Sequence, residues 1–450
     1  MNILFASSEV YPFSKTGGLG DVAHSLPLAI KQYLNISVAT PLYDFIDRKK
    51  YNIVPFLESF TLILNSKEYK IEFFKTNFNG IETIFIYEEN LCKTNRIYGL
   101  KNDGLRFGIF SYAIAHLATK LMFDTIHLND WHTALTALFL KDKKDIKTLL
   151  TIHNIAYQGI FDKSILKELE IDEKYFNMEA LEFYNRVNFL KGGIAFSDFI
   201  TTVSPTYAKE IQTKEFGCAL EGFIKKYSYK LKGILNGIDT KMFNPATDSC
   251  LDDLNINKQL KSFDTQKAIF IFIGRLVEQK GIDLLMECFD EFSLLNIELI
   301  ILGDGKKDIA NSLQEASNRY KNIYFLNGYN ECLAHQLYAL ADFLLMPSRF
   351  EPCGLNQMIA ARYRAIPIVH SVGGLKDSVF ENKKRCIQGF CFSKFSKEEL
   401  LKAVKRALKL YNNKDAFEKI LNFNQKCDVS FKKSAKEYIK IYLTLQGKRV

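Results

Sequence analysis

Short apolar runs alternate with helix-like segments throughout the second half of the sequence, and this alternation restricts the fold more than any other feature. The runs lie at residues 268–274, 298–302, 323–326, 343–346 and 366–370, and each is followed by a helical pattern or a helix start. Neighbouring parallel strands need a crossover connection, which is usually a helix. The pattern therefore predicts βαβ units, a parallel sheet and the α/β fold class.

The first half shows the same pattern with an additional group of more polar strands. Residues 3–8, 36–40 and 199–204 have the composition of buried strands, whereas 60–64 and 71–76 alternate between apolar and polar side chains. Such alternation is typical of antiparallel strands with one solvated face. We therefore expect a second, largely parallel sheet that carries an antiparallel edge.

The length of the chain, 450 residues, exceeds what a single core usually supports. A polar and irregular stretch at 240–266 is the expected interdomain linker. We predict a first Rossmann-like domain at 1–240 and a second, nucleotide-sugar-binding domain at 241–430. Residues 431–450 should form a helix that packs back toward the first domain.

Composition excludes several classes of protein. The net charge of +9 is mild, comes from residues spread along the chain, and is weak evidence for nucleic acid. No apolar run is long enough for a membrane span, and the first residues lack the basic region of a signal peptide. We expect a cytoplasmic protein that binds neither nucleic acid nor membrane.

The cysteines give no sign of a disulfide framework. There are nine of them, and no two form a CxxC pair. This pattern predicts neither disulfides nor a zinc site, so the thiols are expected to be reduced.

The segment at 347–355 joins an apolar strand to a helix and is the strongest candidate for a binding loop. Pro352 and Gly354 break the backbone, so Gly354, Leu355 and Asn356 can point N–H groups toward an anion at the helix start. Glu351 is a good acceptor for sugar hydroxyls. These features suggest a phosphorylated sugar or a nucleotide sugar, although an ordinary βα loop with a solvated Glu351 is the alternative.

A glycine-rich loop follows the first strand. Gly17, Gly18 and Gly20 lie between strand and helix, and Lys15 supplies a cation beside them. Glycines allow a backbone to approach a ligand closely. The alternative is that they only form a tight turn.

Two further strands of the first half end in polar groups. Residues 126–132 include Asp130, and residues 149–154 include His153. Either histidine-bearing segment alone is more often structural, but two strand ends that deliver Asp130 and His153 to one sheet edge favour a site. The histidines lack HxH or HExxH spacing, so no metal site is expected.

Arg275 and Lys280 follow a strand of the second half and could bind the same diphosphate. Arginine offers a planar fork and lysine a point charge. Two solvated surface cations are the alternative. If both cations serve a departing diphosphate, no metal is needed there.

Six motifs in order give a specific resemblance. They lie at 15–21, 151–159, 202–207, 233–239, 274–281 and 347–355, and together they closely resemble bacterial glycogen synthases and plant starch synthases. The resemblance implies a GT-B architecture, with two Rossmann-like doubly wound domains facing each other across a cleft. It also implies transfer of glucose from ADP-glucose to the non-reducing end of an α-1,4-glucan such as glycogen, with retention at the anomeric carbon and without a cofactor or metal.

The resemblance also implies catalytic roles for five residues. Arg275 and Lys280 would hold the leaving diphosphate, and Glu351 would bind hydroxyls of the transferred glucose. His153 would lie near the 6-hydroxyl of that glucose, and Asp130 on the acceptor side.

The remaining residues implied by the resemblance bind substrate. The expected set is Lys15, Gly17, Gly18, Asp21, Gln158, Asn236, Cys353, Gly354 and Leu355. Among them, Lys15 and Gly18 would approach the donor phosphates, with Asp21 supporting the loop, and Gln158 and Asn236 would be second-tier pocket residues.

Other activities fit the same fold class. A UDP-glucose-using transferase, a nucleotide-sugar epimerase and an inactive glucan-binding protein are the alternatives. A glucan phosphorylase would need a pyridoxal phosphate lysine in a longer chain. The sequence leaves the oligomeric state open, and no single residue selects adenine over uracil.

Overall fold

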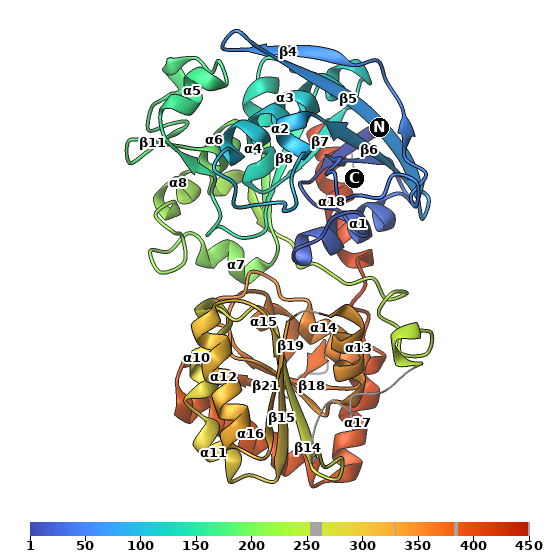
Figure 1. Ribbon diagram of the computed structural model, residues 1–450, viewed down its shortest axis with the longest axis vertical. Coiled ribbons are helices and arrows are strands. Elements are labelled where there is room, and N and C mark those ends of the chain that lie inside the picture. Colours follow the sequence, from blue (N-terminus) through green and yellow to red (C-terminus); the bar gives the residue numbers. More distant parts are fainter. Residues whose placement is uncertain (253–262, 329, 382–385, 449–450) are drawn as a thin grey trace. The chain divides into compact units, whose positions relative to one another are not determined.

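The computed structural model describes residues 1–252, 263–328, 330–381 and 386–448 (Figure 1). The chain divides into two compact units. Unit 1 contains Met1–Val203, Ala208–Asn236 and Phe431–Val450, and unit 2 contains Ser204–Tyr207 and Gly237–Ser430. Each unit is an α/β domain, which confirms the predicted fold class.

Unit 1 is built around a mostly parallel sheet with the strand order β13-β12-β8-β7-β1-β2-β6-β5-β3, and β4 pairs with β5. Its strands are β1 (Asn2–Ala6), β2 (Asn35–Pro41), β3 (Val54–Pro55), β4 (Phe60–Leu64), β5 (Lys67–Phe78), β6 (Ile81–Tyr87), β7 (Thr125–Asn129), β8 (Lys147–Ile152), β12 (Phe199–Thr202) and β13 (Leu231–Gly233). The expected antiparallel edge is confirmed, because β5 runs antiparallel to β3, β4 and β6.

Helices cover both faces of this sheet (Figure 1). They are α1 (Gly18–Ile30), α2 (Glu89–Cys92), α3 (Asp103–Lys120), α4 (Trp131–Leu140), α5 (Ser164–Glu168), α6 (Phe189–Phe196), α7 (Pro205–Glu210, shared with unit 2), α8 (Glu221–Lys226) and α18 (Lys432–Leu445). A small sheet of β9 (Ile160–Phe161), β10 (Glu182–Phe183) and β11 (Arg186–Asn188) lies outside the main one. The last helix, α18, packs in unit 1, where the Tyr442 hydroxyl contacts His127 Nδ1 at 2.6 Å.

Unit 2 contains an all-parallel sheet with the order β16-β15-β14-β17-β18-β21. These strands are β14 (Ala268–Ile273), β15 (Ile297–Gly303), β16 (Ile323–Asn327), β17 (Phe343–Met346), β18 (Ile366–His370) and β21 (Phe390–Phe392), and a separate pair joins β19 (Val379–Phe380) to β20 (Ile387–Gln388). Both faces of β14, β15, β17 and β18 are buried, which explains why these strands are apolar runs without alternation.

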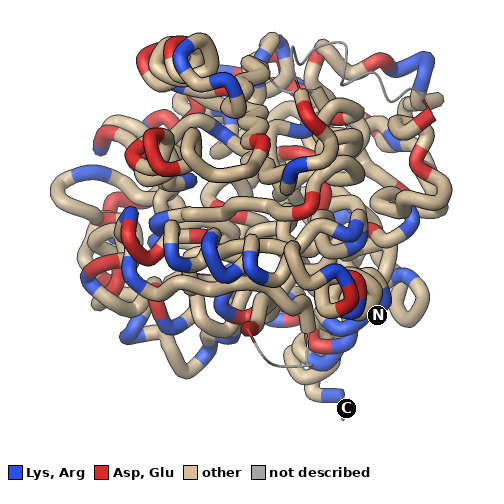
Figure 2. The backbone as a smooth tube through the Cα atoms, turned by 90° about the horizontal axis from the view of Figure 1, so that it is seen from below, with Lys and Arg blue, Asp and Glu red and all other residues tan. Residues whose placement is uncertain are grey.

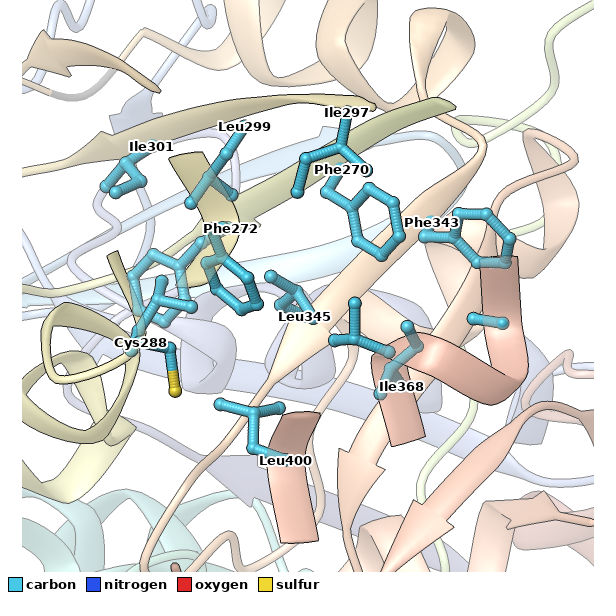
Figure 3. Packing of buried hydrophobic residues seen from close by; sticks show 14 of the residues in the cluster. Phe270, Phe272, Cys288, Ile297, Leu299, Ile301, Phe343, Leu345, Ile368 and Leu400 are labelled. Atoms are coloured by element: carbon cyan, nitrogen blue, oxygen red, sulfur yellow. The ribbon is translucent and has the colours of Figure 1, made fainter. Parts of the chain in front are cut away.

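The helices of unit 2 lie on both sides of its sheet, with α10, α11 and α12 on one side and α13 and α14 on the other (Figure 1). They are α10 (Ile282–Met286), α11 (Phe289–Ser293), α12 (Lys307–Arg319), α13 (Glu331–Leu340), α14 (Asn356–Arg362), α15 (Gly373–Ser378), α16 (Lys397–Tyr411) and α17 (Lys414–Gln425). Figure 3 shows part of the core, where Phe272 and Leu345 of neighbouring strands face Leu400 of α16.

The structure corrects the expectation that every thiol is reduced. Cys250 and Cys332 form a disulfide across 82 residues of sequence, within unit 2. The expectation failed because it relied on local CxxC spacing, whereas this pair is brought together only by tertiary folding.

The predicted linker at 240–266 is also shorter than expected on its N-terminal side. Phe243 is buried, its ring centroid lies 5.1 Å from that of His335, and a short 3-10 helix forms at Ser249–Leu251. Residues up to 252 therefore pack as part of unit 2, and 253–262 lie outside the described residues.

Acidic and basic residues are interspersed along most of the backbone trace in Figure 2. None of the helices that the structure describes is long and apolar enough to cross a membrane.

Candidate active site

The glycine-rich loop of unit 1 lies between β1 and α1, at the carboxyl end of a central strand. Lys15 Nζ makes an ion pair with Asp21 Oδ1 at 2.8 Å, and both side chains are largely buried. Gly17 is the extended residue before α1, and Gly18 is the first residue of the helix. A Cβ on Gly20 would lie 3.1 Å from the Lys15 side chain, so this glycine lets the lysine fold over the helix start.

Glu9 holds this loop in place, a role that the sequence analysis missed. Its carboxylate accepts hydrogen bonds from Thr16 N at 2.5 Å, from Gly17 N at 3.3 Å and from the Tyr98 hydroxyl at 2.9 Å. The side chain is buried, and desolvation raises its pKa. Glu9 is therefore a positioning residue for the Lys15 loop.

Asp130 and His153 lie side by side at the carboxyl ends of β7 and β8. Asp130 Oδ1 accepts a hydrogen bond from the His153 backbone N–H at 2.7 Å, and Asn129 Oδ1 contacts His153 Nε2 at 2.8 Å. Asp130 has a φ of 56°, which is uncommon for a residue with a side chain. Such strained backbone is typical of functional positions.

Burial sets the protonation of both groups. Desolvation raises the pKa of Asp130 to about 7, although backbone N–H groups of His153 and Asn154 oppose this rise. Desolvation also lowers the pKa of His153 to about 3. His153 is therefore a neutral imidazole near pH 7, and because Nε2 donates to Asn129 Oδ1, Nδ1 is the acceptor nitrogen.

Gln158 and Asn236 occupy different surroundings. Both ends of the Gln158 amide are used in the fold: Nε2 donates to Cys218 O at 2.9 Å, and Oε1 accepts from Asn188 Nδ2 at 2.6 Å. Asn236 is buried, and its Oδ1 has no hydrogen-bond partner among the described residues. Of the two, Asn236 retains an acceptor for a ligand.

In unit 2, Lys280 and Glu351 form one pair from two different βα loops. Lys280 Nζ lies 2.6 Å from Glu351 Oε2, and the Ser348 hydroxyl donates to the same carboxylate oxygen at 2.9 Å. The Glu351 side chain is 6% exposed and that of Lys280 is 22% exposed. The Glu351 carboxylate is thus shielded from solvent, whereas the Lys280 ammonium group remains accessible to a ligand.

Gly281 makes the close approach of these loops sterically allowed. It has a φ of 71°, and a Cβ at this position would lie 1.8 Å from the carbonyl oxygen of Pro347. The Arg349 N–H also donates to Gln279 O at 2.9 Å, which joins the two loops through their backbones. Arg275 is beside them, with Nη2 3.4 Å from Gln279 Oε1.

The turn at Cys353, Gly354 and Leu355 leads into α14. Gly354 has a φ of 71°, and Gln357 Nε2 donates to the carbonyl oxygens of Gly354 at 2.9 Å and of Cys353 at 3.2 Å. A Cβ on Gly374 would lie 2.2 Å from Cys353 O. Two glycines and one glutamine therefore fix the shape of this turn at the helix start.

Each unit thus presents a different kind of chemistry at the carboxyl ends of its strands. Unit 1 offers a lysine beside a helix start, a buried carboxyl group and a neutral imidazole. Unit 2 offers Arg275, and a lysine held against a buried carboxylate. Open α/β sheets bind their ligands at this edge.

Comparison with known proteins finds two family models that match this chain. Residues 2–226 match the model of the starch synthase catalytic domain, and residues 254–421 match that of glycosyl transferases group 1. A glycogen synthase of Aquifex aeolicus (strain VF5) is 42% identical over 99% of this chain and 100% of its own. One of Fervidobacterium nodosum is 38% identical over 100% of this chain and 99% of its own.

A solved structure is similar over the same length. The catalytic domain of starch synthase IV from Arabidopsis thaliana, bound to ADP and acarbose, superposes with a TM-score of 0.92. It is 30% identical in sequence and covers 99% of both chains. These similarities extend through both units.

Proposed function

Because the chain belongs to the glycogen synthase family of glycosyltransferases with the GT-B fold, we propose that it transfers glucose from ADP-glucose to the non-reducing end of an α-1,4-glucan such as glycogen. The anomeric configuration is retained in this proposal. The observation that carries it is the Lys280–Glu351 pair at the strand ends of unit 2, in a chain similar to glycogen synthases over its full length.

In the proposed reaction, the bond from glucose C1 to the diphosphate oxygen breaks and its electron pair leaves with ADP. Arg275 and Lys280 bind the departing diphosphate, where negative charge grows. Fixed cations at such a position stabilise the transition state more than the ground state. Lys280 is already held at the end of its loop by Glu351, so little reorganisation is needed when the phosphate replaces part of that contact.

Glu351 has the second role in unit 2. Its buried carboxylate orients hydroxyls of the transferred glucose and favours positive charge on the sugar ring as the bond breaks. The oxygen of the acceptor hydroxyl then bonds to C1 on the face that the phosphate leaves, and its proton passes to the departing phosphate oxygen. The turn at 353–355 supplies backbone contacts to the same donor.

The residues of unit 1 complete the proposed assignment. Lys15, Gly17 and Gly18 approach the donor phosphates, and Asp21 and Glu9 fix their loop. His153 accepts a hydrogen bond from the 6-hydroxyl of glucose through Nδ1, since its other nitrogen donates to Asn129.

Three further residues of unit 1 act away from the donor phosphates in this proposal. Asp130 lies on the acceptor side, Asn236 offers its buried oxygen to a ligand, and Gln158 supports the pocket through its contacts with Cys218 and Asn188. No step of the proposed transfer needs a cofactor, and we place the reaction in the cytoplasm.

The test supplies purified protein with ADP-glucose or UDP-glucose, in the presence and absence of glycogen. The proposal predicts ADP release that matches glucose incorporation and depends on glycogen. Extension with UDP-glucose alone would overturn the choice of nucleotide, and nucleotide release without glycogen would indicate hydrolysis or epimerisation. Glycogen binding without release from either donor would identify an inactive glucan-binding protein.

A further inference from the structure

Four side chains with the chemistry of metal ligands meet in unit 2, and none of them has a role in the proposed glucosyl transfer. Asp248 and Cys250 lie at the short 3-10 helix Ser249–Leu251, and Cys332 and His335 lie in the first turns of α13. The two cysteines form the disulfide, and His335 Nδ1 lies 2.8 Å from Asp248 Oδ2.

The spacing of these residues explains why they converge. Cys332 and His335 are three apart on a helix, so they share one face. Asp248 caps the 3-10 helix by accepting from the Cys250 backbone N–H at 3.0 Å, which turns both side chains toward α13. Two short motifs, Asp-x-Cys and Cys-x-x-His, thus supply one cluster.

The ligand atoms are grouped closely enough for one small cation to bring them together. One ligand atom from each of Asp248, Cys250 and His335 lies within 4.8 Å of the others, and Cys332 Sγ is bonded to Cys250 Sγ. Zinc binds sulfur at roughly 2.3 Å and nitrogen or oxygen at roughly 2.0–2.2 Å, which places tetrahedral ligands roughly 3.3–3.8 Å apart. Modest side-chain movement after the disulfide opens would reach this geometry.

The surroundings are those of a fixed site. The side chains of Asp248 and His335 are only 5% and 7% exposed. The Tyr363 hydroxyl also donates to Asp248 Oδ2, and the ring of Phe243 packs against His335. Neighbouring groups that hydrogen-bond to or pack against metal-ligand side chains fix the orientation of those side chains for a metal. Cysteines with a histidine in an intracellular enzyme are more often metal ligands than structural disulfides.

We infer that the reduced protein binds one Zn²⁺ through Asp248, Cys250, Cys332 and His335, and that the disulfide is the oxidised form of this site. A dithiol reductant gives two electrons and two protons to the Cys250–Cys332 bond and becomes a disulfide itself. Zinc then displaces the two thiol protons, which pass to solvent. His335 coordinates as a neutral imidazole, with its single proton on the other nitrogen. In either form the cluster fastens residues 248–250 to α13.

The test measures bound zinc by mass spectrometry after the full chain is reduced with dithiothreitol, incubated with zinc sulfate and desalted without oxygen. The wild-type chain should retain about one zinc ion. Cys250→Ser and Cys332→Ser should lose it, whereas Cys218→Ser, which changes an exposed free thiol, should retain it. Zinc retained equally by all three variants, or absent from reduced wild type, would overturn the inference.

A second measurement needs no variant and is therefore independent of folding defects. Cobalt added to the reduced wild-type chain should give thiolate-to-metal charge transfer and the intense visible bands of a tetrahedral site, and these should vanish when the disulfide forms. Spectra identical in the reduced and oxidised chains would contradict the assignment. Both readouts are separate from glucosyl transfer, so failure here leaves the proposed function untouched.

Discussion

Lys280 Nζ lies 2.6 Å from Glu351 Oε2, although 71 residues separate them in the sequence. Glu351→Gln keeps the shape of the side chain but removes its negative charge. In our proposal this charge stabilises the positive charge that grows on the sugar ring in the transition state. We expect turnover to fall by roughly 10²-fold while the Kd for ADP stays within a few-fold, because the cations that hold the diphosphate remain. Steady-state kinetics and calorimetric titration with ADP measure the two effects.

The matched control for this variant is Glu278→Gln, whose exposed side chain pairs with Lys306 instead. Its turnover should equal that of wild type. If Glu351→Gln weakens ADP binding and leaves turnover intact, Glu351 serves the nucleotide and its assigned role is wrong.

The buried carboxyl group of Asp130 should make stability depend on pH. Its folded pKa of about 7 is above the ordinary value of 3.8, so the folded protein keeps a proton that the unfolded chain loses between these values. The stabilisation is fully present below about pH 4 and is lost as the pH rises through about 7.

Between about pH 5 and pH 8 the free energy of unfolding of wild type should therefore fall more than that of Asp130→Asn, by an amount on the order of 2 kcal/mol. Asp145→Asn, at an exposed position, should follow wild type. Parallel curves for wild type and Asp130→Asn in scanning calorimetry would show that Asp130 ionises at its ordinary pKa.

Removing the carboxylate of Glu9 should loosen the Lys15 loop. Glu9→Ala leaves the backbone N–H groups of Thr16 and Gly17 without their acceptor, so we expect KM for ADP-glucose to rise about tenfold, or ~1.4 kcal/mol. Turnover at saturation should change much less. Tyr98→Phe removes one donor to Glu9 and leaves the loop contacts, and it should keep KM near wild type. Equal KM values for Glu9→Ala and wild type would show that Glu9 does not position the Lys15 loop for the donor.

The close contact at Gly281 gives a prediction on stability. Gly281→Ala would bring a Cβ to 1.8 Å from Pro347 O at a φ of 71°, so the two loops must move apart. We expect a loss of at least ~2 kcal/mol in the free energy of unfolding, measured in urea. Gly222→Ala, in a helix with nothing within 4 Å of the new methyl group, is the control and should be neutral or stabilising. Equal midpoints for both variants would contradict the steric argument.

Local patterns predicted the strands and their loops because each buried strand of unit 2 is a continuous apolar run bounded by turn residues. The apolar runs predicted at 343–346 and 366–370 coincide with β17 and β18, since their composition is a local signal. The same logic placed Lys280 and Glu351 in βα loops. It could not pair them, because the pairing depends on how two distant loops pack.

The features that sequence reasoning missed depend on contacts that no local motif indicates. Glu9 resembles any polar residue after a strand until Thr16 and Tyr98 are placed beside it. The disulfide of Cys250 with Cys332 has no local motif. Gln158 was expected as a second-tier pocket residue, and its amide contacts with Cys218 and Asn188 join distant parts of the chain.

The most direct test of the proposed chemistry is the rate of glucose transfer from ADP-glucose to glycogen by Lys280→Ala. Loss of a fixed cation beside the leaving diphosphate should lower turnover by about 10²- to 10³-fold, or ~3–4 kcal/mol, with a similar loss in Arg275→Ala and none in the exposed variant Lys306→Ala. Turnover of Lys280→Ala and Arg275→Ala within about threefold of wild type would show that these cations do not stabilise the leaving group.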